Sequence, residues 1–181
     1  MVVIRQVKVL WSVKVEGKRS KDSSIIMTQQ MNPQDANLAG NVHGGVIMKF
    51  IDSAALAVAV RHARANAVTA SIDRLDFHFP VFVGDLLMAQ ASLNFVGKTS
   101  MEIGVRVETE NLMTGRVHHT STAYLTFVAL DKSGRPMQLP PLILKTEEEQ
   151  RQNLEAKTRR EMRLKEKTQE KLNHINSDCT A

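Results

Sequence analysis

A single carboxylate inside an apolar helical stretch constrains this chain more than any other feature. Residues 46–60 read VIMKFIDSAALAVAV, and Lys49 and Asp52 are the only ionisable groups among them. A lysine can extend its four methylenes toward solvent, whereas a short aspartate cannot. Steps of about 100° per residue place small and apolar side chains on the Asp52 side of the helix. The carboxylate must therefore find hydrogen-bond donors, take up a proton, or lie in a cleft open to a ligand.

A His-Gly-Gly turn opens this helix and supplies backbone donors. Gly44 and Gly45 lack side chains where the first N–H groups of the helix have no intrahelical acceptor, so a carbonyl oxygen can approach them closely. Donors of this kind, aimed at a developing oxyanion, contribute roughly 3 kcal/mol. With Asp52 about two turns further on, they form a candidate hydrolytic pair. The same pattern also fits a structural role, in which the glycines allow close packing and Asp52 caps a backbone group or pairs across an interface.

Composition narrows the class of protein. A chain of 181 residues with 43% hydrophobic residues fits one domain with a proper core. No apolar run is long enough to span a membrane, and the N-terminus lacks a secretory pattern, so we expect a cytoplasmic protein. The single cysteine, Cys179, predicts neither a disulfide framework nor a thiolate metal site. The net charge of +5 lies in the termini, since residues 23–144 carry nine basic and nine acidic groups, and we expect no nucleic-acid partner.

The segments around the helix carry strand patterns. Residues 7–15 alternate apolar and polar side chains, and residues 24–31 form a second extended run. The helix itself is predicted over residues 43–65. After it the period changes to two, which predicts strands over residues 68–79, 87–95, 101–107 and 117–130, with a bulge near Asp73 and Arg74 in the first.

This order of elements predicts an α+β fold, in which an antiparallel β-sheet wraps around one long central α-helix. Residues 1–22 form an N-terminal extension that fits an extra strand, residues 23–145 the principal domain, and residues 146–181 a charged helical tail. The tail contains many Glu, Lys and Arg residues and few apolar ones, which predicts a solvated helix.

Several motifs together resemble the hotdog-fold acyl-CoA thioesterases of the cytosolic acyl-CoA hydrolase type. The matching segments run from residue 27 to residue 149 and read NPQDANLAGNVHGG, VIMKFID, AVTASIDRLDFHFPVFVGD, GKTSMEIGVRVETENLMTG and AYLTFVALDKSGRPMQLPP. The resemblance implies a hotdog domain over residues 23–145. It also implies a homodimer, assembled further into a trimer of dimers.

The resemblance also assigns roles to residues. Asp52 takes the position of the catalytic carboxylate, Asn37 that of an asparagine presented from the partner subunit, and Gly45 that of the glycine whose N–H holds the thioester oxygen. The implied reaction is hydrolysis of a fatty acyl-CoA to a free acid and CoA, with no cofactor. Asp52 would either activate a water as general base or attack the carbonyl as nucleophile, and the sequence leaves both open.

Substrate-binding residues are expected at the helix opening and at one hairpin turn. His43 and Gly44 belong to the opening, where the histidine is expected to position the turn. The GKTS turn offers Lys98, Thr99 and Ser100 as donors for phosphate or pantetheine. Hairpin turns with no binding role often have the same composition. Ser71, on the strand after the helix, is a further candidate.

No metal site is expected. His118 and His119 are adjacent, so on a strand they point to opposite faces and cannot jointly hold an ion.

Two other functions compete with hydrolysis. A non-catalytic acyl-CoA-sensing module would carry a DNA-binding domain or lack the carboxylate, and this chain keeps Asp52. A hotdog dehydratase would need an Asp and His pair at the start of the helix, and Asp52 and His62 lie too far along it.

Overall fold

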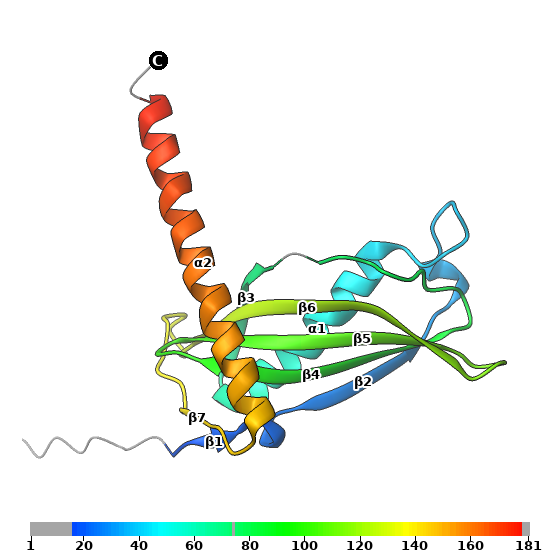
Figure 1. The fold of residues 1–181 in the computed structure, drawn as a ribbon, viewed down its shortest axis with the longest axis horizontal. Helices are drawn as coiled ribbons and strands as arrows, with labels where there is room; N and C mark the ends of the chain where they lie inside the picture. The colour runs from blue at the N-terminus through cyan, green and yellow to red at the C-terminus, as the bar shows by residue number, and fades with distance from the viewer. Residues whose placement is uncertain (1–15, 74, 179–181) are drawn as a thin grey trace, which may run out of the picture.

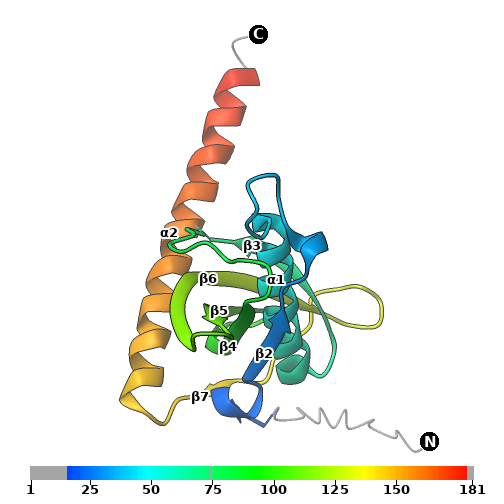
Figure 2. The same ribbon diagram turned by 90° about the vertical axis from the view of Figure 1, so that its right-hand side faces the viewer.

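A five-stranded antiparallel sheet curls around one long helix in the computed structural model, which describes residues 16–73 and 75–178, with side chains to residue 170 (Figure 1). The strand order is β2-β4-β5-β6-β3, so β2 and β3 are the edges. The strands are β2 (Ile25–Gln30), β3 (Asn66–Ile72), β4 (Leu86–Val96), β5 (Ser100–Asn111) and β6 (Arg116–Leu130). Helix α1 (Gly44–Ala63) lies against the concave face (Figure 2). The predicted α+β architecture is confirmed.

Helix α1 begins and ends at local signals. His43 is its N-cap, and Arg64 ends it in the left-handed region at φ 53°. The helix buries Ile51, Ala54, Val58 and other small or branched side chains against the sheet. The facing strands alternate in the same way, and their inward residues are buried aliphatic side chains and one aromatic ring: Leu87, Ala89, Ala91, Leu93, Ile103, Val105, Val107, Ala123, Leu125 and Phe127. Three of these strand side chains are alanine, as are several buried ones on α1, which lets α1 lie close to the strands.

The strand after α1 is shorter than its sequence pattern predicted. Strand β3 ends at Ile72, and its register shifts between Thr69 and Ser71, so the bulge expected near Asp73 and Arg74 lies earlier. Residues 75–79, predicted as strand, form an irregular segment tied to β6 by His78 N–H, which donates to the Thr120 carbonyl at 2.8 Å. The carbonyl is available because the β5–β6 pairing skips Thr120 at a second irregularity.

Short elements attach part of the N-terminal extension to the domain. Strand β1 (Lys18–Arg19) pairs in parallel with β7 (Leu142–Ile143) and leads into η1 (Ser20–Asp22). Ser20 Oγ donates to the Leu93 carbonyl at 2.9 Å. The strand expected over residues 7–15 and the predictions for Cys179 lie outside the described residues. No helix in the described ranges is long and apolar enough to cross a membrane.

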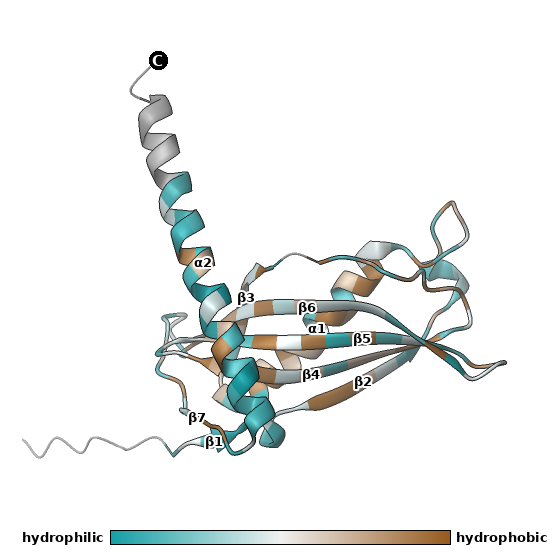
Figure 3. Ribbon diagram, in the orientation of Figure 1, coloured by the Kyte–Doolittle hydropathy of each residue, from teal (hydrophilic) through white to brown (hydrophobic). Residues whose placement is uncertain are grey.

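The charged tail is a helix, as predicted, but it is not solvated on all sides. The first half of helix α2 (Glu147–Asp178) crosses the outer face of the sheet (Figure 1), although most of its coloured residues in Figure 3 are hydrophilic. It buries Asn153 and Ala156 there. Asn153 donates to the Asn94 carbonyl at 2.8 Å. The prediction of a fully solvated helix rested on the low hydropathy of α2. It was wrong because α2 packs on the sheet through polar contacts and not through an apolar surface.

One buried carboxylate on the sheet holds two arginines of α2. Glu102 on β5 is 1% exposed. It accepts hydrogen bonds from Arg159 at 2.7 Å and from Arg163 at 3.2 Å. Arg159 also lies over the ring of Tyr124, with its guanidinium carbon 3.7 Å from the ring centroid. These contacts fix the first half of α2 to the sheet.

Candidate active site

Asp52 lies half-buried on α1, on the side that faces β3. Thr69 Oγ1 donates a hydrogen bond to Asp52 Oδ1 at 2.6 Å. The second carboxylate oxygen has no hydrogen-bond partner among the described residues. The threonine therefore orients the carboxylate and leaves one oxygen available for a water or a substrate.

The helix opening is occupied by a side chain of its own. His43 Nδ1 accepts a hydrogen bond from the Gly45 N–H at 2.9 Å. The sequence suggested that this N–H has no acceptor, but the imidazole caps it. A Cβ on Gly45 would lie 3.1 Å from that nitrogen, which explains why glycine suits this position. Because Nδ1 accepts, the neutral ring carries its proton on Nε2. A carbonyl oxygen can take this N–H only by replacing the imidazole as its acceptor.

Asn37 lies in a loop between η2 (Pro33–Asp35) and α1. Its backbone N–H donates to the Asn41 carbonyl at 2.7 Å, and its Oδ1 accepts the Ala39 N–H at 2.8 Å. It makes no hydrogen bond to Asp52 within this protomer, and its side-chain amide stays available as a donor. The loop projects from the domain, and Leu38 beside Asn37 is fully exposed.

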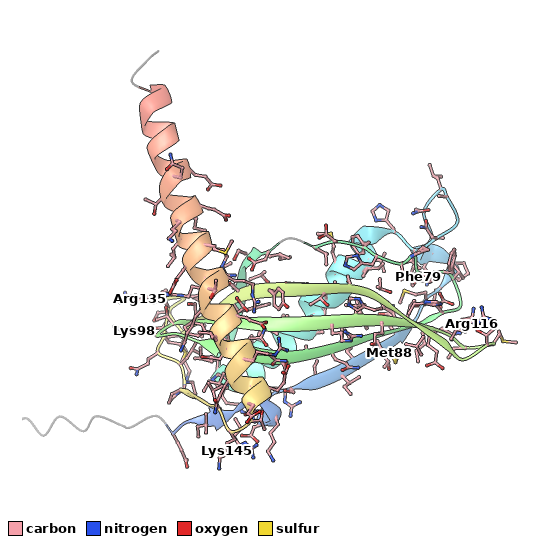
Figure 4. The ribbon with its side chains drawn as sticks, in the orientation of Figure 1. Phe79, Met88, Lys98, Arg116, Arg135 and Lys145 are labelled. Atoms are coloured by element: carbon pink, nitrogen blue, oxygen red, sulfur yellow. The ribbon has the colours of Figure 1, made fainter. Side chains whose placement is uncertain are left out.

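The GKTS turn lies at the other end of the sheet from the β5–β6 hairpin. Lys98 and Arg116 mark these two ends in Figure 4. The turn is held by Gly97 N–H, which donates to the Ser100 carbonyl at 2.8 Å, and by contacts from Leu139 and Ala129 to backbone carbonyls. Ser100 instead shares a small hollow with Ser71, on the outer side of β3. The structure therefore separates the predicted substrate-binding residues into three places: the helix opening with His43 and Gly44, the turn with Lys98 and Thr99, and the hollow with Ser71 and Ser100.

His62, His118 and His119 have structural environments. His62 is buried and its Nε2 lies 2.8 Å from the Pro140 carbonyl, and burial is the main cause that lowers its pKa. It does not face Asp52, which removes the acid–base pair that a dehydratase would need. His118 stacks on Phe79, whereas His119 contacts Thr122, so the two adjacent rings separate as predicted. Within the described residues, no group of three His, Cys, Asp or Glu can hold a metal ion.

Thr69 is the site residue that sequence reasoning missed. The sequence contained one signal for it. The strand that follows a helix returns alongside it, so a hydroxyl residue on that strand can reach a carboxylate on the helix. The sequence alone does not fix which residue of the strand points at the helix, because the bulge between Thr69 and Ser71 changes the alternation of side chains.

The sequence of this chain is similar to those of known thioesterases. The family model described as the thioesterase superfamily matches residues 39–116. A Bacillus subtilis protein, YkhA, named as an uncharacterized acyl-CoA thioester hydrolase, is 40% identical over 134 residues, which cover 74% of this chain and 78% of that protein. The cytosolic acyl coenzyme A thioester hydrolase of Mus musculus is 37% identical over 131 residues, which cover 71% of this chain but 34% of that longer protein.

Solved structures agree with these sequence relatives. The crystal structure of an apo-hexameric acyl-CoA thioesterase aligns with a TM-score of 0.80 at 39% identity, covering 84% of this chain and 97% of that one. An acyl-CoA hydrolase from Staphylococcus aureus was solved in complex with butyryl coenzyme A, coenzyme A and coenzyme A disulfide. It aligns with a TM-score of 0.79 at 33% identity, covering 86% of this chain and 95% of that one.

The Staphylococcus aureus hydrolase has also been solved as three alanine variants, at an asparagine, an aspartate and a threonine. These positions stand 15 and 17 residues apart along that chain. Asn37, Asp52 and Thr69 have the same residue types and the same spacing here. With its curled sheet, its central helix and these relatives over most of its length, the chain belongs to the acyl-CoA hydrolase family of hotdog-fold thioesterases.

Proposed function

We propose that this protein hydrolyses fatty acyl-CoA thioesters to a free acid and CoA, at a site that two copies of the chain share. The observation that carries the proposal is the Asp52 carboxylate, held by Thr69 at 2.6 Å with its second oxygen free. The spacing shared with the Staphylococcus aureus variants and that hydrolase's complex with butyryl coenzyme A support it.

Helix geometry supports a site built from two subunits. Gly45 and Asp52 are seven residues apart, which is about 10 Å along the helix axis. An oxyanion donor and a group that activates the attacking water must both act on one carbonyl, within about 3 Å of their targets. On one helix, an extended chain of oxyanion, carbonyl carbon and water would have to fill nearly all of that gap, whereas groups from two subunits can approach one carbonyl more closely. We therefore assign Asp52 and Thr69 from one protomer to the same site as Asn37 and Gly45 from its partner.

In this site each group has one task. Asp52 activates a water as general base, or attacks the thioester carbonyl itself and is regenerated by hydrolysis of the resulting anhydride. The Gly45 N–H, released by His43, holds the developing oxyanion, and the Asn37 amide orients the water or the substrate. The CoA thiolate leaves readily and needs no strong general acid. The proposed reaction uses no cofactor and no metal ion, and CoA enters only as part of the substrate.

Exposed apolar residues support assembly of copies. Val68 and Ile72 on edge strand β3 are 43% and 40% exposed, and the outer edge of β3 pairs with no described strand. Leu38, next to Asn37, is fully exposed. Exposed apolar side chains at an open edge and beside a site residue are typical of an interface. We propose a homodimer, assembled into a trimer of dimers, that works in the cytoplasm; a hexameric relative and a relative named as cytosolic support this.

The competing function is acyl-CoA sensing without turnover. Thiol release from a panel of acyl-CoAs, from acetyl to palmitoyl, separates the two. Turnover on at least one ester supports the hydrolase, and the panel then ranks the acyl length. Tight binding of CoA esters with no thiol release on any of them supports the sensor instead.

Mixing inactive subunits tests the shared site. Asp52→Asn and Asn37→Ala should each be inactive alone. After the two are unfolded together and refolded, half of the dimers are hybrids, and each hybrid has one site with both native residues. Activity should recover to about a quarter of the wild-type value. No recovery, with hybrids demonstrated by mass spectrometry, would mean that both residues must come from the same chain.

A further inference from the structure

An ion pair ties the end of strand β3 to helix α2. Arg163 Nη1 lies 2.5 Å from Asp73 Oδ2, and Asp73 directly follows the last residue of β3, Ile72. The two side chains are 16% and 18% exposed, so solvent screens this pair less than it screens a surface ion pair. The same guanidinium also binds the buried Glu102, which holds it in place. Helix α2 therefore fixes the chain just beyond β3, where the two elements meet in Figure 1.

The position of Asp73 depends on the bulge in β3. Thr69 and Ser71 pair with consecutive residues of β6, so Ala70 between them has no partner in the ladder. Thr69 and Asp73 are four residues apart, and on a regular strand residues an even number apart point to the same face. The extra residue changes this alternation. Thr69 consequently points inward to Asp52, whereas Asp73 points outward to α2.

The ladder beyond the bulge is short. Of the described residues, Ser71 and Ile72 pair with β6 there, and the Asp73 N–H donates to the Tyr124 carbonyl at 2.9 Å. A slip by one residue would remove the bulge and move the strand end by about 3.3 Å. Such a slip turns Asp73 to the inner face and breaks its pair with Arg163. The ion pair therefore favours the bulged register over the regular one.

The register of β3 decides where the Thr69 hydroxyl lies. Its bond to Asp52 is 2.6 Å long, and hydrogen bonds of this kind weaken when the heavy atoms are more than about 3.2 Å apart. Loss of the bulge straightens the backbone directly after Thr69. If the residues before the bulge slip instead, Thr69 turns to the outer face. Either change takes the hydroxyl out of hydrogen-bonding distance of Asp52.

We propose that Arg163 is a positioning residue for hydrolysis, which acts through Asp73 by holding β3 in its bulged register. The proposal rests on the proposed function for the reaction, but the register can be measured without turnover. It gives α2 a role in the reaction from the outer face of the sheet, although the catalytic carboxylate belongs to α1 on the concave face (Figure 2).

Two matched arginine variants separate positioning from simple anchoring. Arg163→Gln and Arg159→Gln each remove one positive charge from α2 and one partner of Glu102. Only Arg163→Gln also breaks the pair with Asp73. Asp73→Asn breaks the same pair from the other side and leaves both arginines on Glu102. Arg163→Lys keeps a cation that can pair with Asp73.

We expect kcat for acyl-CoA to fall about tenfold in Arg163→Gln and in Asp73→Asn, with a smaller change in KM. Arg159→Gln should stay within about twofold of wild type, and Arg163→Lys should retain most of kcat. An equal fall in Arg159→Gln and Arg163→Gln would mean that α2 only anchors, and would overturn the proposal.

A double-mutant cycle tests whether the arginine acts through the threonine. In a Thr69→Val background the register has no hydroxyl to place, so adding Arg163→Gln should lower kcat by no more than about twofold. A further fall of about tenfold would show that Arg163 affects the reaction by another route, and the proposal would then be wrong.

Amide hydrogen exchange measures the register without catalysis. Exchange at the Asp73 N–H should be about tenfold faster in Arg163→Gln than in wild type, and within about twofold of wild type in Arg159→Gln. If this result holds but wild type releases no thiol from any ester, the proposed function fails and the role of Arg163 in the register stands. If wild type turns over and the Asp73 N–H exchanges equally in all three proteins, the positioning role fails alone.

Discussion

Thr69 Oγ1 donates a 2.6 Å hydrogen bond to Asp52 Oδ1 and so ties strand β3 to the carboxylate of helix α1. Because β3 follows α1 directly in the chain, its register decides which side chain meets the acid. The bond orients one carboxylate oxygen and leaves the other open. This contact fixes the geometry of the carboxylate, which no sequence motif shows.

Replacing Thr69 tests that contact. Thr69→Val keeps the shape of the side chain and removes the hydroxyl, so the carboxylate loses its orienting donor. We expect kcat for acyl-CoA to fall about tenfold or more, with a smaller effect on KM, since a hydrogen bond to a charged group contributes about 1.5–3 kcal/mol. Thr69→Ser should retain most of kcat. Equal losses in the serine and valine variants would show that the hydroxyl is not what matters.

His43 should act as a cap and not as a proton donor. His43→Ala removes the acceptor of the Gly45 N–H and should lower the free energy of unfolding by about 1 kcal/mol, as the loss of an N-cap does. His43→Asn should restore much of this stability, because asparagine is a favourable cap. Urea denaturation measures both. If kcat of the asparagine variant collapses while its stability is normal, the imidazole takes part in the chemistry.

The Glu102 network should hold α2 to the sheet. Glu102→Gln leaves Arg159 and Arg163 without their shared carboxylate in a largely buried place. We expect a loss of about 3 kcal/mol in the free energy of unfolding. Glu108→Gln is the control, because its pair with Arg106 is more exposed and should contribute under about 1 kcal/mol. Similar melting temperatures for the two variants would contradict a structural role for the network.

His62 should make stability depend on pH. Burial lowers its pKa from the usual 6.5, against an opposing hydrogen bond to the Pro140 carbonyl and with a small contribution from the charge of Lys18. The folded state therefore prefers the neutral ring, and the unfolded chain takes up the proton first as the pH falls. This contribution is complete above pH 6.5 and is lost below it, with a slope of at most about 1.4 kcal/mol per pH unit.

Denaturation curves from about pH 7.5 to about pH 5.5 measure that slope. His62→Gln removes the titrating group and should flatten the dependence in this window. If the variant keeps the wild-type slope, other groups cause it.

Local patterns predicted much of the fold. The sequence predicts a helix over residues 43–65, and α1 spans Gly44–Ala63, because a period of 3.6 and a Gly-Gly turn at the start are local signals. Asp52 could be singled out for the same reason, since an acid among apolar helical residues is visible in the sequence. Site roles for Asn37 and Gly45 came only from the resemblance to hotdog thioesterases.

Long-range contacts were beyond the sequence. The Thr69–Asp52 bond depends on a bulge that alternation cannot locate, and the capped state of Gly45 depends on one rotamer of His43. The prediction that α2 is solvated was wrong, because its arginines bind Glu102 on the sheet. A polar helix face gives no sign in the sequence that it packs against another polar group.

The most direct test of the account is thiol release from acyl-CoA by wild type and by Asp52→Asn, with equal folding checked by circular dichroism and oligomer mass. Asparagine keeps the size of the side chain and an acceptor for Thr69, but it can neither take a proton from water nor act as a nucleophile. We predict turnover by wild type and a fall of at least about a thousandfold in kcat for the variant. Turnover by the folded variant within about tenfold of wild type would contradict the assignment of Asp52 as the catalytic carboxylate.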